Sequence, residues 1–257
     1  MCIRDSHARP SDTSQAPHRA AMLSWIGRFF DSSIGKKVTM ALTGLLLVGF
    51  LVMHLAGNLL LLEGPEGEAF GAYAQKLHNL GPLLYVAEAG LIGLFGLHIG
   101  FAVRTILGNR RARASAGGSA GGSKYAVSSG HGGKTFASAS MPITGSIVLF
   151  FLIVHILNFR LDGAFKGLFV HGADGESHYA QAAGVVIEEL ASPLIAILYL
   201  VGIAALTVHL SHGIQSAFQT LGAHHPKFTP MLRPAGVAIA VLIGLGFASL
   251  PLFALLQ

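Results

Sequence analysis

Histidine is the residue type with the most evident chemistry in this chain, because it is frequent and falls in unusual places. The sequence has 13 histidines and only 12 aspartate and glutamate residues. Five histidines lie within long apolar segments, where an ionisable side chain is expensive and is by default a functional candidate. These five are His54, His98, His155, His209 and His212.

Four of these histidines are spaced so that two pairs form, one at each of two depths. His54, His98, His155 and His209 each lie on a different apolar segment. With a helical rise of about 1.5 Å per residue, His54 and His155 fall roughly 6–7 Å outside the centres of their segments, and His98 and His209 roughly 5–8 Å inside. The two layers are then about 12 Å apart. Haem b takes two axial imidazoles from different helices, so this pattern predicts two bis-histidine haems.

Alternatives exist for these residues. A lone histidine in a membrane can instead hydrogen-bond to a neighbouring helix. His212 lies three residues after His209 on about the same helix face and is the alternative ligand; His209 is preferred because His212 falls about 13 Å from the centre of its segment. A flat macrocycle also needs small neighbours, although any one glycine can instead serve close helix packing. The candidate glycines are Gly44, Gly49, Gly57, Gly90, Gly93, Gly96, Gly100, Gly145, Gly202 and Gly213.

The composition places these histidines in a membrane protein. Of 257 residues, 52% are hydrophobic and 11% are charged, whereas soluble domains carry roughly a quarter charged residues. So few charges exclude a soluble globular enzyme, and the apolar content excludes intrinsic disorder. The single cysteine, Cys2, excludes a disulfide scaffold, a cysteine-ligated iron–sulfur cluster and a c-type haem.

Five apolar windows are long enough to cross a hydrocarbon core of roughly 30 Å as helices. Their continuous apolar character favours helices over the alternating strands of a barrel. The sequence therefore predicts an all-α integral membrane protein with five transmembrane helices, of which the first four form a haem-binding bundle. The expected spans cover residues 38–62, 83–107, 141–159, 192–215 and 234–255.

The distribution of lysine and arginine predicts the orientation of these spans. Fourteen of the 17 basic residues precede the first span, lie at the end of the second span, or lie in the loops after the second and fourth spans. Nine of the 12 acidic residues lie on or near the opposite side. The positive-inside rule then places the N-terminus in the cytoplasm and the C-terminus outside, in agreement with an odd number of spans.

The remaining segments are expected to contribute less. Residues 1–23 are expected to be a disordered or spurious N-terminal extension, since they lack the apolar core of a signal peptide. Residues 24–257 are expected to form one membrane domain. Within it, residues 112–133 are typical of a flexible Gly/Ser loop, and a short interfacial helix is expected near Tyr179–Leu190.

Charged candidates lie towards the ends of the spans. Glu88 is the one acidic residue inside a span. It either faces interfacial water or exchanges protons with a quinone, because quinone reduction takes up protons with electrons. At the inner interface, Arg104, Lys36 and Lys37 either pair with haem propionates or extend to lipid phosphates.

Four segments resemble those that carry the haem ligands in the five-helix, two-haem cytochrome b subunit of bacterial succinate dehydrogenase and fumarate reductase. The resemblance covers about residues 24–257, and its specificity lies in the order, spacing and topology of the segments together. The chain departs from the family in its long Gly-rich loop and in Met141-Pro142 at the start of the third span. The four segments are Phe50–Asn58, Gly96–Phe101, Val154–Arg160 and Val208–Gly213.

This resemblance implies an electron-carrying anchor in the cytoplasmic membrane of a bacterium. His54 and His155 would share the haem far from the soluble subunits, and His98 and His209 the near one. Flavin and iron–sulfur clusters would belong to two separate soluble subunits docked on the cytoplasmic face, with menaquinone as the redox substrate in the lipid. Succinate chemistry would then occur outside this chain, and no nucleic-acid partner is expected.

Two other function classes remain open on the sequence. One is the di-haem cytochrome b subunit of another quinone-linked oxidoreductase, such as a hydrogenase or nitrate reductase, although such subunits typically crowd several ligands onto fewer helices. The other is a transporter without haem, in which the histidines relay protons. The transporter alone predicts that the purified protein has no haem spectrum.

Overall fold

The structure is a computed structural model that describes residues 25–116, 136–161, 181–223 and 225–257. Every regular element in these ranges is a helix, and they contain no strand. The predicted all-α class is therefore confirmed for the described part of the chain. The expected extension over residues 1–23 lies outside the described residues.

Five helices are long and apolar enough to cross a membrane, as predicted, and they mark a multi-pass membrane protein. Each predicted span falls on one of them. Most of these helices extend beyond the predicted spans, because helical hydrogen bonds continue into polar flanks where hydropathy falls. The five are α2 (Ser33–Asn58), α4 (Pro82–Ala116), α5 (Phe136–Ile156), α8 (Pro193–Thr220) and α9 (Thr229–Ala254).

Local residues fix several helix ends. The Ser32 Oγ accepts a hydrogen bond from the Gly35 backbone N–H at 2.9 Å and caps the start of α2. Pro193 occupies the first turn of α8, where a missing N–H leaves no helical bond unmade. Gly222, with a φ of 90°, ends the same helix in a left-handed conformation that glycine adopts without strain.

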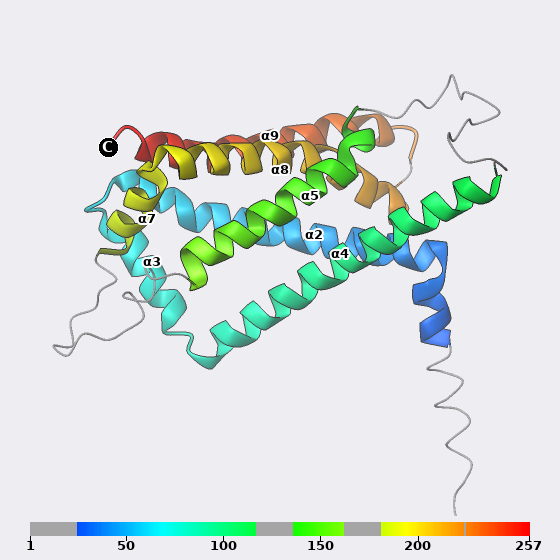
Figure 1. The fold of residues 1–257 in the computed structure, drawn as a ribbon, viewed down its shortest axis with the longest axis horizontal. Coiled ribbons are helices and arrows are strands. Elements are labelled where there is room, and N and C mark those ends of the chain that lie inside the picture. The colour runs from blue at the N-terminus through cyan, green and yellow to red at the C-terminus, as the bar shows by residue number, and fades with distance from the viewer. Residues whose placement is uncertain (1–24, 117–135, 162–180, 224) are drawn as a thin grey trace, which may run out of the picture.

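The long helices form two pairs joined at the centre of the molecule. Helix α4 packs along α2, α5 packs along α8, and α2 and α8 contact each other between the pairs. Helix α9 covers the side of α8 and contacts α2. Figure 1 shows α4 diverging from the other long helices towards its Pro82 end. The four histidine-bearing helices are thus neighbours, with α9 as an outer support.

Short helices close one end of the bundle. They are η1 (Leu59–Glu63), α3 (Glu68–His78), the single-turn π-helix η2 (Leu157–Leu161) and α7 (Ala182–Ala191). Helix α7 falls on the predicted short helix, and it is packed against α3, α8 and α9. Helix α3 was not expected from the sequence. The buried side chains of this end include Leu61, Phe70, Ile187, Tyr199 and Leu250.

The first residues of the predicted Gly/Ser loop are helical. Helix α4 continues to Ala116, so residues 112–116 are helical. The rest of the predicted loop, residues 117–133, lies outside the described residues.

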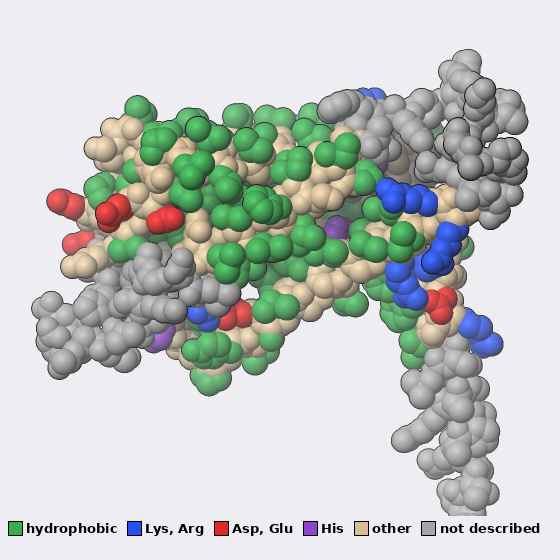
Figure 2. Space-filling model, in the orientation of Figure 1, with side chains coloured by type: hydrophobic (Ala, Val, Ile, Leu, Met, Phe, Trp, Pro, Cys, Tyr) green, Lys and Arg blue, Asp and Glu red, His purple; other side chains and the backbone are tan. Residues whose placement is uncertain are grey.

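Charge is distributed unequally between the two ends of the bundle. Figure 2 shows basic side chains gathered where α2 begins and α4 ends, and acidic side chains at the opposite end near α3 and α7. The described basic residues at the first end include Lys36, Lys37, Arg104, Arg110 and Arg111. The positive-inside rule uses this asymmetry and predicts that the end with the basic residues faces the cytoplasm.

A histidine-lined cavity as the candidate functional site

A cavity of about 1120 Å³ lies between α2, α4, α5 and α8. It exceeds the range of about 300–1000 Å³ typical of a pocket for one drug-sized ligand. Its lining is largely apolar and includes at least one histidine from each of the four helices. Figure 2 shows a histidine side chain recessed among apolar side chains near the middle of the molecule. The lining histidines from separate helices are His54, His98, His155 and His209.

The structure brings together His54 and His155, the pair predicted to lie outside the centres of their spans and called the outer histidines below, with His98 and His209 as the inner ones. The ring centroids of His54 on α2 and His155 on α5 are 5.8 Å apart, with their planes at 82°. One turn earlier on each helix, a phenylalanine ring lies beside the imidazole: Phe50 at 5.2 Å from His54, and Phe151 at 5.9 Å from His155. The i, i+4 spacing produces both contacts, because residues four apart share a helix face.

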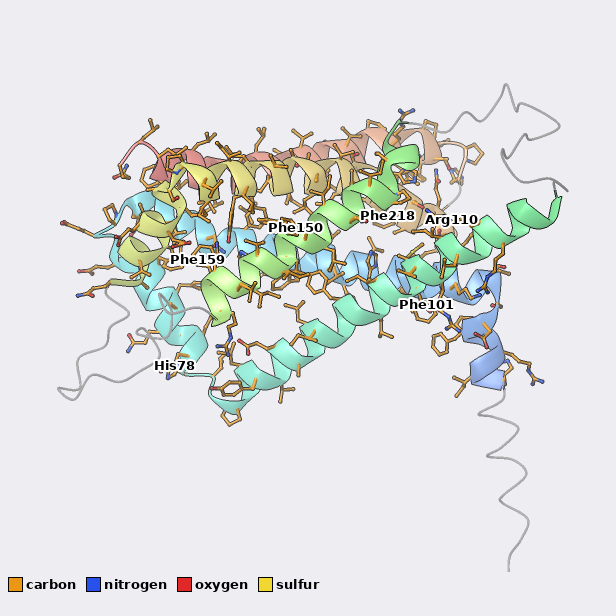
Figure 3. All side chains as sticks on the ribbon, viewed as in Figure 1. His78, Phe101, Arg110, Phe150, Phe159 and Phe218 are labelled. Atoms are coloured by element: carbon orange, nitrogen blue, oxygen red, sulfur yellow. The ribbon has the colours of Figure 1, made fainter. Side chains whose placement is uncertain are left out.

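The Nδ1 atoms of the outer histidines have partners of different kinds. The Nδ1 of His155 lies 3.3 Å from the Tyr199 hydroxyl of α8. The Nδ1 of His54 lies 3.4 Å from the side-chain nitrogen of Asn58, which also donates to the His54 carbonyl at 2.7 Å. Phe159, labelled in Figure 3, lies 5.5 Å from His155 and 5.9 Å from Tyr199 between ring centroids.

Each inner histidine contacts a threonine on a neighbouring helix. His98 Nδ1 on α4 lies 3.2 Å from the Thr43 hydroxyl on α2. His209 Nδ1 on α8 lies 3.3 Å from the Thr144 hydroxyl on α5. The two predicted inner ligands therefore line the same cavity. Each of them contacts a residue of the helix that packs against its own helix.

The candidate glycines fall into three groups: some line the cavity, some lie close to a neighbouring side chain, and at the others an added Cβ would have no neighbour within 4 Å. A Cβ at Gly44 would lie 3.2 Å from the His98 ring, and one at Gly145 would lie 3.4 Å from the His209 ring. A Cβ at Gly57 would instead meet Tyr73, and one at Gly202 would meet Phe151. Of the ten glycines expected to make room for a macrocycle, Gly44, Gly145 and Gly213 line the cavity.

The residues of this cavity fit haem better than a free metal ion. Among the described residues, no group of three or more histidine, cysteine, aspartate or glutamate side chains is placed to hold an ion. Two imidazoles suffice for an iron whose other four ligands are macrocycle nitrogens. With metal–imidazole bonds of about 2 Å, two axial rings lie about 6 Å apart between centroids. The 5.8 Å separation of His54 and His155 agrees with that spacing.

His212, the alternative ligand on α8, also lines the cavity. His209 differs from it in having the Thr144 hydroxyl at its Nδ1 and the Gly145 backbone beside its ring. These contacts favour His209 as the inner ligand. His78 of α3, labelled in Figure 3, also lines the cavity.

Glu88 forms a two-bond ion pair with an arginine that the sequence did not assign to it. Arg160 Nε donates to Glu88 Oε1 and Arg160 Nη2 to Glu88 Oε2, each at 3.0 Å. Both residues line the cavity. The pair joins the second turn of α4 to the segment that follows α5, at the end of the bundle closed by the short helices.

Arg104, predicted to reach a haem propionate, makes a different contact. Its guanidinium donates to Asp31 at 2.8 Å, and both side chains are exposed. It also lies 5.9 Å from the Phe101 ring centroid. Phe101, labelled in Figure 3, in turn contacts Phe30 of the helical residues 25–31. Of the predicted propionate partners, Lys37 is among the residues that line the cavity, and Arg104 is not.

Thr43 and Thr144 were missed from the sequence, although a repeat marks them. The first and third spans share the pattern Met-x-x-Thr-Gly followed, after nine residues, by His. In the first span this pattern runs from Met40 to His54, and in the third from Met141 to His155. The equivalent threonines contact the equivalent inner histidines.

In comparisons with known proteins, no family model, no curated protein and no solved structure matches this chain. Functional inference therefore depends on the geometry of the cavity and on the residue pattern of its four helices.

Proposed function

We propose that this chain is the membrane-anchor cytochrome b subunit of a succinate:quinone oxidoreductase. It passes electrons between an iron–sulfur subunit and menaquinone through two bis-histidine haems b. The observation that carries the proposal is the convergence of one histidine from each of four helices on a single apolar cavity, with two of the imidazole rings 5.8 Å apart.

The four histidines divide into two binding pairs in this proposal. His54 and His155 hold the outer haem, and His98 and His209 hold the inner one. When bound, haem iron supplies reversible one-electron oxidation and reduction. The chain would contribute the imidazoles that hold each haem, the apolar walls that exclude water, and the Nδ1 partners that orient each ring.

Glu88 and Arg160 are the groups we assign to quinone chemistry at the outer end. A quinone needs an apolar site and a proton donor or acceptor near its oxygens. The cavity supplies apolar lining, and the Glu88 carboxylate lies in that lining, oriented by both hydrogen bonds from Arg160. Glu88 accepts and releases the protons that accompany quinone turnover. If Glu88→Gln left quinone turnover and its pH profile unchanged, this role would be excluded.

The basic end of the bundle is the side we assign to the soluble partners. Its lysines and arginines predict a cytoplasmic position by the positive-inside rule. The flavoprotein and iron–sulfur subunits dock there, beside the inner histidine pair. The chain itself is the electron-transfer subunit, and oxidation of succinate takes place in its partners.

A reduced-minus-oxidised absorbance spectrum of the purified membrane protein tests the proposal. A b-type band that appears on addition of succinate to the intact complex is the expected result. A b-type band that hydrogen or nitrate, but not succinate, alters would instead support a subunit of another quinone-linked oxidoreductase. The absence of any b-type band would refute both and favour a proton-relay transporter.

A further inference from the structure

Thr43 and Thr144 occupy equivalent positions and make the same set of contacts. Each lies eleven residues before an outer histidine in the repeated pattern of α2 and α5. Each hydroxyl reaches a backbone carbonyl one turn earlier on its own helix, Thr43 to Thr39 at 2.8 Å and Thr144 to Ser140 at 3.1 Å. Each hydroxyl also lies beside the Nδ1 of an inner histidine on the adjacent helix.

These contacts favour one tautomer of the inner histidines. A hydroxyl has one hydrogen to donate and lone pairs to accept with, whereas a backbone carbonyl can only accept. When the threonine hydroxyl donates its hydrogen to the carbonyl, the hydroxyl oxygen remains as an acceptor for the histidine. The Nδ1 of His98 or His209 then carries the proton and donates it. The lone pair of each imidazole is therefore on Nε2.

The glycine that follows each threonine completes the arrangement. Gly44 and Gly145 leave the space in which the His98 and His209 rings lie against the helix backbone, since a Cβ there would approach the ring carbon to 3.2 and 3.4 Å. The Thr-Gly pair thus fixes both the hydrogen bond and the position of the ring. The same pair at two sites is unlike the outer histidines, whose partners are Asn58 and Tyr199.

We propose that Thr43 and Thr144 are positioning residues that hold His98 and His209 as Nδ1–H tautomers, so that each presents its Nε2 to the inner cofactor position. This proposal rests on the assignment of His98 and His209 as haem ligands. It adds that the inner pair, unlike the outer pair, is oriented by two equivalent hydroxyls from neighbouring helices. A partner that accepts from the free imidazole N–H fixes ligand orientation and raises ligand basicity.

Nitrogen-15 NMR of the full-length chain in lipid, prepared without haem, tests the tautomers directly. Thr43→Val removes the hydroxyl but keeps the shape of the side chain, and it is expected to weaken the Nδ1–H signal of one histidine, because the Met40 backbone carbonyl also accepts from His98. Thr144→Val is expected to abolish that of a second histidine. Thr43→Ser retains the hydroxyl and is expected to restore the wild-type spectrum. Unchanged histidine signals in both valine variants would overturn the proposal.

Thr207→Val is the matched control for these variants. Thr207 lies on α8 and makes the same backbone contact, to Ile203 at 2.8 Å, but it packs against Gly244 of α9 rather than against a histidine. Its replacement should leave all histidine signals as in the wild type. Loss of the same Nδ1–H signals in this control would show that a general packing change causes them, and would also overturn the proposal.

Haem binding separates this inference from the function on which it rests. Loss of an outer-sphere partner typically lowers metal affinity by about 10–100-fold. Thr43→Val and Thr144→Val should each lower the affinity of the inner haem by this factor and raise its midpoint potential, while the outer haem keeps its wild-type values. Equal affinities in wild type, Thr43→Val and Thr207→Val would refute the positioning role alone. A wild-type chain that binds no haem would refute the proposed function, whatever the NMR result.

Discussion

The ion pair between Glu88 and Arg160 gives a quantitative prediction about how the Pro82 end of α4 is held to the rest of the bundle. It connects α4, whose long axis diverges from the other helices towards the Pro82 end (Figure 1), to the segment after α5. Elsewhere α4 is packed along α2. Breaking the pair should therefore loosen the outer end of α4 more than any other part of the bundle.

The magnitude follows from the geometry and exposure of the pair. The Arg160 and Glu88 side chains are 43% and 35% exposed, so the pair lies at the surface of the bundle rather than in its interior. Exposed ion pairs contribute about 0.2–1 kcal/mol, and paired parallel N–H···O bonds place this one at the upper end of the range. We expect a coupling energy of about 1 kcal/mol, which corresponds to about a fivefold change in an equilibrium constant.

A double-mutant cycle measures this coupling. Glu88→Gln, Arg160→Gln and the double variant are compared with the wild type by reversible unfolding in detergent or lipid. The coupling energy is the difference between the change in the free energy of unfolding in the double variant and the sum of the changes in the two single variants. The exchanged variant, Glu88→Arg with Arg160→Glu, should recover most of the lost stability. A coupling energy of zero, or no recovery on exchange, would refute the claim that this pair joins α4 to α5.

Three other single substitutions are expected to lower the stability of the protein, to raise it, and to leave it nearly unchanged. Gly202→Ala should destabilise the protein by about 1–3 kcal/mol, because the added Cβ would overlap the Phe151 ring; a stability equal to that of the wild type would contradict the packing of α5 on α8. Gly49→Ala has no neighbour within 4 Å of its new Cβ and should stabilise α2 by about 0.5–1 kcal/mol in the same unfolding assay. Arg104→Gln loses an exposed ion pair with Asp31, so it should change stability by less than about 1 kcal/mol and leave any haem spectrum unchanged, whereas loss of a haem would return Arg104 to the cofactor site.

The membrane spans could be predicted from the sequence because hydropathy over about 20 residues indicates whether a helix is surrounded by lipid or by water. Helix α3 could not be predicted in this way. It has 11 residues and a mixed composition, and it is fixed by the burial of Phe70 among residues of η1 and α7 that are far apart in the sequence. Such short helices depend on tertiary packing more than on their own pattern.

Residue number yields a prediction for the depth of the histidines, but it yields none for most of their lateral contacts. A constant rise along the helix axis gives depth from residue number alone. Contact between Thr43 and His98 also depends on how α2 and α4 are rotated and paired, and the residue ranges of the expected spans do not give this information. The contact of Arg104 with Asp31 could not be predicted for the same reason, since the helical residues 25–31 lie against α4 only in the folded chain.

The most direct test of the account is the ratio of haem b to chain in the purified protein and its histidine variants. We predict two haems in the wild type and in His212→Ala, and one each in His54→Ala and His98→Ala. The haem that remains should differ between the last two variants in its midpoint potential. A wild type without haem, or two haems retained in both His54→Ala and His98→Ala, would contradict the assignment of these histidines as two axial pairs.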